Sequence, residues 1–178
     1  MTDSSRNSGA WSTTPHDYLA TRQDSYSDER LRRSCYLTMR DGVRIATDIF
    51  VPAEAGWETP LPTIAMFTPY YRRFKLTSQA TAETEESPNA GYICDFFTQH
   101  GYAVVVVDVR GSGASFGTRD GFRSPKERLD YAEIADWIVV QPWSNRSIGS
   151  TGISYVGAAA DFLATTGHPA VKAVIPTF

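Results

Sequence analysis

The run Gly152-Ile153-Ser154-Tyr155-Val156-Gly157 decides the fold class of this 178-residue chain. It lies between a strand candidate that is weakened by its glycines and an alanine-rich helix candidate. A serine in such a run is typical of the nucleophile elbow, whose glycines two residues before and two after the serine allow a strand to turn sharply into a helix. The elbow exposes the serine hydroxyl above the sheet and directs the next backbone N–H toward a developing oxyanion. We interpret Ser154 as a nucleophile; the alternative is a tight turn that contains an ordinary serine.

Strands and helices alternate around this run. Two β-leaning stretches flank Asp41-Gly42, which is the strongest short signal for a hairpin. The next strands are expected over 63–68, 102–108, 147–153 and 171–175. Helices are expected over 91–100, from Ser124 to just before Pro142, and over 156–166. This order predicts an α/β fold with a leading hairpin and a mainly parallel sheet that carries helices on both faces.

The helix that follows residue 123 has the clearest start signal. Ser124 is a candidate cap, and Pro125 suits the first helical position. Glu127 stands three residues after the cap, which predicts a reciprocal capping box. Apolar residues then recur at helical spacing through Ile138, so one face of this helix is expected to be buried.

Composition excludes several classes of protein. The formal net charge is −3 and the isoelectric point about 5.6, so we expect no nucleic-acid partner. The chain contains no run of about 18 apolar residues, so the sequence predicts no membrane span. Residues 1–33 are polar and turn-rich, without the apolar core of a secretory signal, and are interpreted as a flexible leader of a cytoplasmic protein. Residues 34–178 form the predicted domain; Cys35 and Cys94 have no metal-like spacing.

Several further motifs make the chain recognisable. From about residue 36 to 175 it resembles the N-terminal part of the catalytic domain of the cocaine-esterase / X-prolyl dipeptidyl-peptidase (CocE/NonD) family. The resemblance rests on the order and spacing of these pieces: Met39-Arg40-Asp41-Gly42-Val43-Arg44 with Ala46-Thr47-Asp48, Thr68-Pro69-Tyr70, Gly101-Tyr102-Ala103-Val104-Val105-Val106, Asp108-Val109-Arg110-Gly111, Gln141-Pro142-Trp143 and Gly152-Ile153-Ser154-Tyr155.

The resemblance implies an α/β-hydrolase fold and a set of site residues. Ser154 would accept the acyl group, and the oxyanion would bind the backbone N–H of Tyr155 and the hydroxyl of Tyr70. Tyr71 is a second, weaker candidate donor, and Tyr70 could instead be a packing residue. The implied substrates are small esters, acyl-amides or X-prolyl peptides, hydrolysed without cofactor or metal.

Two other signals receive structural interpretations. The glycine-rich segment from Gly111 to Gly117 follows a strand, but its third glycine stands one position late for a dinucleotide-binding loop. We therefore expect no cofactor there. Asp108 and Arg110 are expected to support the loops around the site through ion pairs or hydrogen bonds.

The sequence lacks an evident base for Ser154. In α/β-hydrolases the acid and the histidine follow the serine, yet only Asp161 and His168 do so here, in or just after the next helix. His16 and His100 precede the serine and fit no triad order. The family's later strands, helical cap and C-terminal β-sandwich are also absent.

Two hypotheses follow from these absences. In the first, the chain is a truncated serine hydrolase with little activity alone, whose partner could be a missing C-terminal half. In the second, it is a non-catalytic binding, regulatory or split-protein subunit that keeps the hydrolase scaffold. Self-association into a homo-oligomer is a further possible partnership.

Overall fold

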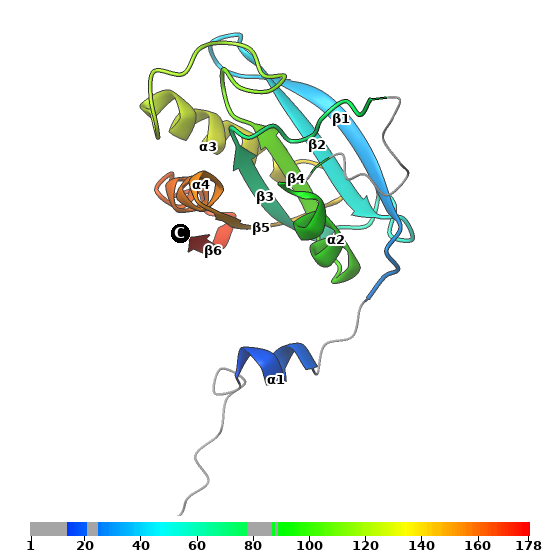
Figure 1. Cartoon of the computed structure of the whole chain (residues 1–178). Helices are drawn as coiled ribbons and strands as arrows, with labels where there is room; N and C mark the ends of the chain where they lie inside the picture. The colour runs from blue at the N-terminus through cyan, green and yellow to red at the C-terminus, as the bar shows by residue number, and fades with distance from the viewer. Residues whose placement is uncertain (1–13, 21–24, 78–86, 88) are drawn as a thin grey trace, which may run out of the picture.

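A computed structural model describes residues 14–20, 25–77, 87 and 89–178 (Figure 1). Within them, one six-stranded sheet has the strand order β1-β2-β4-β3-β5-β6. The strands are β1 (Arg30–Thr38), β2 (Arg44–Pro52), β3 (Leu61–Thr68), β4 (Ala103–Asp108), β5 (Ser144–Ile153) and β6 (Val171–Thr177). The helices are α1 (Pro15–Ala20), α2 (Gly91–Gln99), α3 (Pro125–Val139) and α4 (Tyr155–Ala164).

The sheet is mixed, as the sequence predicts. β2 pairs antiparallel with both β1 and β4, whereas β4, β3, β5 and β6 run parallel to one another. The hairpin register joins Thr38 to Arg44. Gly42 lies in the turn between them with φ +78°, a conformation that glycine adopts without a steric penalty.

The hairpin is longer than the sequence indicates. β1 begins at Arg30, where the residue pairs with Pro52, so residues 30–33 belong to the sheet and the predicted leader extends too far there. The reason is that β1 is an edge strand with mostly exposed side chains, so its residues show little apolar pattern. Residues 1–13 lie outside the described part of the chain, and their interpretation as leader stays a prediction.

Helices cover both faces of the sheet, which confirms the expected architecture (Figure 1). α3 and α4 pack on one face around a core that includes Tyr131, Ile138 and Leu163. α2 packs on the other face, where Cys94 is fully buried against β2, β3 and β4. Every residue of β4 is buried, as expected for a central strand that is covered on both sides.

The predicted capping box at α3 is only half present. Ser124 Oγ accepts a hydrogen bond from the backbone N–H of Glu127 at 3.3 Å, so Ser124 is the cap. The Glu127 side chain does not return to the cap. It is fully buried and is held by Arg119 and Tyr155, whose hydrogen bonds compete more strongly for this carboxylate.

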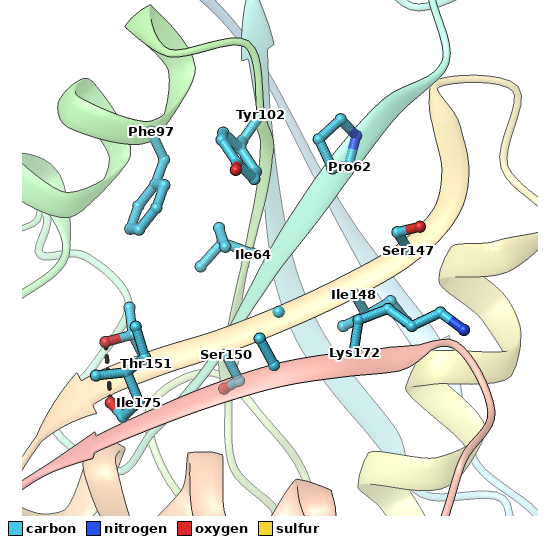
Figure 2. Close-up of a pocket in the computed structure, with 12 residues that line it drawn as sticks. Pro62, Ile64, Phe97, Tyr102, Ser147, Ile148, Ser150, Thr151, Lys172 and Ile175 are labelled. Atoms are coloured by element: carbon cyan, nitrogen blue, oxygen red, sulfur yellow. Dashed lines mark hydrogen bonds between the residues drawn. The ribbon is translucent and has the colours of Figure 1, made fainter. Parts of the chain in front are cut away.

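β6, the edge strand at the other end of the sheet, is also poorly covered. Most residues of β6 are exposed, including Ile175 at 65%. On the α2 side of β5 and β6 lies an apolar groove of about 310 Å³ (Figure 2). Phe97 and Tyr102 form one wall, and Thr151 and Ile175 lie along its floor. Among the described residues, no helix is long and apolar enough to cross a bilayer.

Candidate active site

The turn from β5 into α4 holds Ser154 in a strained conformation. Its backbone angles are φ 59° and ψ −123°, in a region that non-glycine residues rarely occupy. The N–H of Ser154 donates to the carbonyl of Thr177 in β6 at 2.9 Å, which fixes the turn against the neighbouring strand. The side chain is exposed at the carboxyl edge of the sheet. Strain held in this way is common where a residue must present a reactive group.

The two glycines of the run allow close approach at this turn. A Cβ on Gly152 would lie 2.3 Å from Val156 Cγ1, and one on Gly157 would lie 2.5 Å from the carbonyl oxygen of Thr177. The elbow pattern expects a glycine two residues after the serine, but Val156 occupies that position here. Gly157 stands three residues after Ser154, one position later than expected. The spacing here is therefore G-x-S-x-x-G, and the second glycine admits β6 to the first turn of α4.

The Tyr70 hydroxyl reaches Ser154. Its oxygen lies 3.4 Å from Ser154 Oγ, although the two residues are 84 positions apart in the chain. The backbone N–H of Tyr70 donates to Thr68 Oγ1 at 2.9 Å, so Tyr70 is fixed just beyond the carboxyl end of β3. Tyr71 instead packs edge-on against Phe74, with ring centroids 5.5 Å apart. Of the two tyrosines considered, the structure brings Tyr70 to the serine.

Tyr155 contributes to the site in two ways. It is the first residue of α4, so its backbone N–H has no acceptor within the helix and is available at the positive helix end. Its phenol donates to Glu127 Oε2 at 2.7 Å and accepts from Arg119 at 2.9 Å. Burial, together with the hydrogen bond to Glu127, raises the pKa of the Tyr155 phenol. The phenol therefore stays neutral and anchors the start of α4.

Glu127 and Arg119 are parts of the site that sequence reasoning missed. Arg119 Nε donates to Glu127 Oε1 at 3.0 Å, which closes a three-residue network with Tyr155. Glu127 is fully buried, an unusual state for a carboxylate that indicates a specific set of partners. In the sequence Glu127 resembles an ordinary first-turn acid, so no local pattern distinguishes it.

A pocket of about 490 Å³ lies beside the two tyrosines that flank Ser154. It is lined by Pro69, Tyr70, Arg119, Gly121, Phe122 and Tyr155. A carbonyl group placed at Ser154 Oγ could direct its oxygen toward the Tyr70 hydroxyl and the Tyr155 N–H. Two such donors are what an oxyanion requires.

None of the three histidines is placed as the base. His168 Nε2 lies 3.1 Å from Asp136 Oδ1, just before β6 begins. Since β5 and β6 are parallel and β6 has seven residues, His168 lies roughly 20 Å from the edge that carries Ser154. His100 contacts Phe96 in α2, and His16 lies in α1.

The acid candidate is placed elsewhere too. Asp161 forms an ion pair with Arg123 on the outer side of α4. Within the described residues, the hydrogen-bond partner of Ser154 Oγ is the Tyr70 hydroxyl. The arrangement agrees with the expectation that neither Asp161 nor His168 completes a triad with Ser154.

Asp108 and Arg110 have the supporting roles expected of them. Asp108 accepts hydrogen bonds from Arg72 and from the backbone N–H of Ala114, so the glycine-rich segment folds over its carboxylate. Arg110 is 3% exposed and pairs with Asp130 and Asp41. In the part of the chain that the structure describes, no three His, Cys, Asp or Glu side chains gather in a way that could hold a metal ion.

Comparison with known proteins identifies relatives of this arrangement. The model of the X-Pro dipeptidyl-peptidase (S15) family matches residues 41–178. A predicted serine esterase of Mycobacterium bovis is 41% identical over 186 residues, covering 100% of this chain and 29% of the relative. Cocaine esterase of Rhodococcus is 32% identical over 141 residues, or 78% of this chain and 22% of that protein.

Solved structures agree with the sequence relatives. A CocE/NonD family hydrolase from Staphylococcus aureus matches 83% of this chain and 27% of its own, with a TM-score of 0.66 and 29% identity. An α-amino acid ester hydrolase matches 98% of this chain and 28% of its own, with a TM-score of 0.65 and 27% identity. The chain thus spans less than a third of the length of these relatives. The expected family resemblance and the α/β-hydrolase fold are confirmed.

Proposed function

Because the chain belongs to the X-Pro dipeptidyl-peptidase (S15) family of hydrolases, we propose that it supplies the nucleophile and oxyanion site of a serine acyl hydrolase. Ser154 Oγ attacks the carbonyl carbon of an ester, an acyl-amide or an X-prolyl peptide. The carbonyl oxygen becomes an oxyanion that accepts hydrogen bonds from the Tyr70 hydroxyl and the Tyr155 N–H. A base from outside the described residues takes the Ser154 proton and returns it to the leaving group, and water, deprotonated by the same base, then hydrolyses the acyl-enzyme.

One observation carries this proposal. The Tyr70 hydroxyl lies 3.4 Å from Ser154 Oγ, on a serine whose backbone is strained and whose side chain is exposed. An ordinary strand-to-helix turn explains neither the strain nor the tyrosine from a distant loop. The adjacent 490 Å³ pocket has room for a small acyl or leaving group.

We further propose that the chain has little hydrolytic activity alone, because its described residues bring no base to Ser154. An oxyanion site without its base retains only part of the catalysis. The sheet also offers a place for a complementing segment. The groove along β5 and β6 is apolar, and β6 is exposed along most of its length (Figure 2). A segment that supplies an apolar helix face for the groove would be such a partner.

A second candidate function is a non-catalytic binding or regulatory subunit. The observation that favours it is that His168 pairs with Asp136 and Asp161 with Arg123, so neither is paired with Ser154. The two functions differ in whether Ser154 reacts once a base is supplied. The cytoplasmic location expected from the sequence belongs to both proposals.

A chimera tests the choice between them. This chain replaces the matching 29% of the M. bovis esterase, and the product is assayed with p-nitrophenyl esters, an acyl-amide and an X-prolyl amide. We expect hydrolysis of at least one substrate and a loss of roughly 10³-fold or more in Ser154→Ala. Tyr70→Phe should cost about 10²–10³-fold in kcat, whereas the matched change Tyr71→Phe should have little effect.

The opposite outcomes are also informative. A folded chimera that hydrolyses none of the three substrates, or that is unaffected by Ser154→Ala, would contradict the hydrolase proposal and favour the non-catalytic one. The isolated chain should react slowly with a fluorophosphonate probe. Robust labelling of Ser154 in the isolated chain would contradict only the proposal of low activity.

A further inference from the structure

We propose that Arg72 is a positioning residue that fixes the Tyr70 hydroxyl beside Ser154. The inference rests on the proposed function, since Tyr70 matters for chemistry only if it stabilises an oxyanion. Tyr70 belongs to a loop that leaves β3 at Thr68 and is 42% exposed, so its ring is not held by burial. Apart from an edge-on contact with the Tyr155 ring, 6.3 Å between centroids, the loop itself must therefore limit where the hydroxyl lies.

Arg72 ties this loop to the sheet at two strands. Its backbone N–H donates to Asp108 Oδ1 at 2.7 Å, and its guanidinium donates to Asp108 Oδ2 at 2.8 Å. Its Nε lies 3.1 Å from Asp48 Oδ1, an ion pair whose N–H direction departs from hydrogen-bond geometry. Asp108 ends β4 and Asp48 lies in β2, so one side chain bridges both strands.

The burial of these groups makes the bridge stiff. Asp48 is 0% exposed, Asp108 is 1% exposed and the Arg72 side chain is 11% exposed. The nearby Arg73 also contributes, because its Nε lies 3.1 Å from Asp48 Oδ2. Removing a partner from a buried pair leaves a charge without compensation, so rearranging Arg72 is costly. The position of the Arg72 side chain in the folded protein is therefore closely fixed.

The two residues before Arg72 connect this bridge to the serine. Tyr71 has φ 69°, a left-handed conformation that a bulky residue adopts only when its surroundings impose it. Tyr70 directly precedes it, and the Tyr70 carbonyl accepts a hydrogen bond from Asn89 Nδ2 at 2.9 Å. The backbone is thus fixed on both sides of Tyr71, which restricts the directions that the Tyr70 side chain can take.

Gly113 supports the same bridge from the other side. A Cβ at this position would lie 2.3 Å from Asp108 Oδ2, so the absence of a side chain leaves room for the carboxylate that holds Arg72. A lysine could not replace the arginine, because a single ammonium cannot imitate a planar group that faces two carboxylates at once. Arg72→Lys keeps the charge and removes the geometry, which makes it the informative substitution.

Tyrosine labelled with ¹³C at the ζ carbon reports on the phenol in the full chain, without any need for activity. Tyr70→Phe assigns the Tyr70 signal among the nine tyrosines. We expect Ser154→Ala to shift this signal in the wild-type background and to leave it unmoved in the Arg72→Lys background. Arg40→Lys is the matched control, since Arg40 also joins two carboxylates, Asp130 and Glu133, but at α3. It should retain the full Ser154-dependent shift.

A second variant guards against loss of folding. Asp108→Asn keeps the size of the side chain and an acceptor oxygen, and it should also weaken the Ser154-dependent shift. The inference is overturned if folded Arg72→Lys or Asp108→Asn keeps the full shift, or if the wild-type signal does not respond to Ser154→Ala.

The chimera separates this inference from the proposed function. In an active chimera, Arg72→Lys should lower kcat roughly 10–100-fold with little change in KM, because a displacement of about 1 Å has that scale of effect. An active chimera indifferent to Arg72→Lys contradicts the inference alone. An inactive chimera with the expected spectra contradicts the proposed function and leaves the positioning contact supported.

Discussion

Replacing Ser154 by glycine should stabilise the protein while it removes the nucleophile. Ser154 has φ 59°, and such conformations cost non-glycine residues about 1–3 kcal/mol. Glycine avoids this strain, but its greater freedom in the unfolded state lowers the unfolding free energy by about 0.5–1 kcal/mol. The hydroxyl is exposed and its partner lies at 3.4 Å, so its loss matters little. Ser154→Gly should therefore exceed Ser154→Ala in unfolding free energy by about 1 kcal/mol.

The assay is urea unfolding at equilibrium, with the same pair of substitutions at Ser147 as the control. Ser147 lies in β5 without a positive φ, so glycine there should be less stable than alanine by about 0.5–1 kcal/mol. The order of glycine and alanine should thus reverse between the two sites. If the glycine variant is less stable than the alanine variant at both positions, Ser154 is not strained. The argument that the turn at Ser154 is a nucleophile elbow then fails.

Three further outcomes can be measured in the same way. Gly157→Ala should lower the unfolding free energy by about 1–3 kcal/mol, because the new Cβ meets backbone atoms of β6 at 2.5 Å. Gly149→Ala, whose nearest contact is the end of the Ile64 side chain at 3.1 Å and whose nearest backbone atom lies at 3.6 Å, should cost clearly less; equal losses would contradict this account. Arg110 lowers the pKa of Asp41, so the stability that this pair contributes is present above the unfolded pKa of about 4 and is lost as pH falls below it. Asp41→Asn should therefore flatten the stability profile between about pH 5 and 3, and an unchanged profile would refute the pairing. Tyr155→Phe should cost about 1–3 kcal/mol, because it removes a donor from buried Glu127; a neutral effect in urea would exclude the network.

The sequence predicted those elements whose local residue pattern matches their surroundings in the folded sheet. Asp41-Gly42 marks a turn because glycine tolerates the positive φ found there. The apolar run that became β4 is buried on both faces, so its composition alone reveals it. The start of β1 was missed because an edge strand can carry arginines such as Arg30 and Arg32 without any apolar alternation.

The site was predicted unevenly for a similar reason. Ser154, Tyr155 and Tyr70 belong to short motifs with a mechanism or a family behind them, and the structure brings all three together. Glu127 and Arg72 act through contacts with residues 28 and 36 positions away. No short sequence pattern identifies a buried carboxylate or a bridging guanidinium, because their partners become neighbours only when the sheet has formed.

The most direct test of the central claim is to locate the covalent adduct in the chimera. The protein is treated with a fluorophosphonate, digested, and mapped by tandem mass spectrometry, with Ser154→Ala treated in parallel. The account predicts one adduct, on Ser154, with a rate reduced by Tyr70→Phe and no adduct in Ser154→Ala. An adduct on another residue, or a folded and unlabelled chimera, would contradict the assignment of Ser154 as the nucleophile.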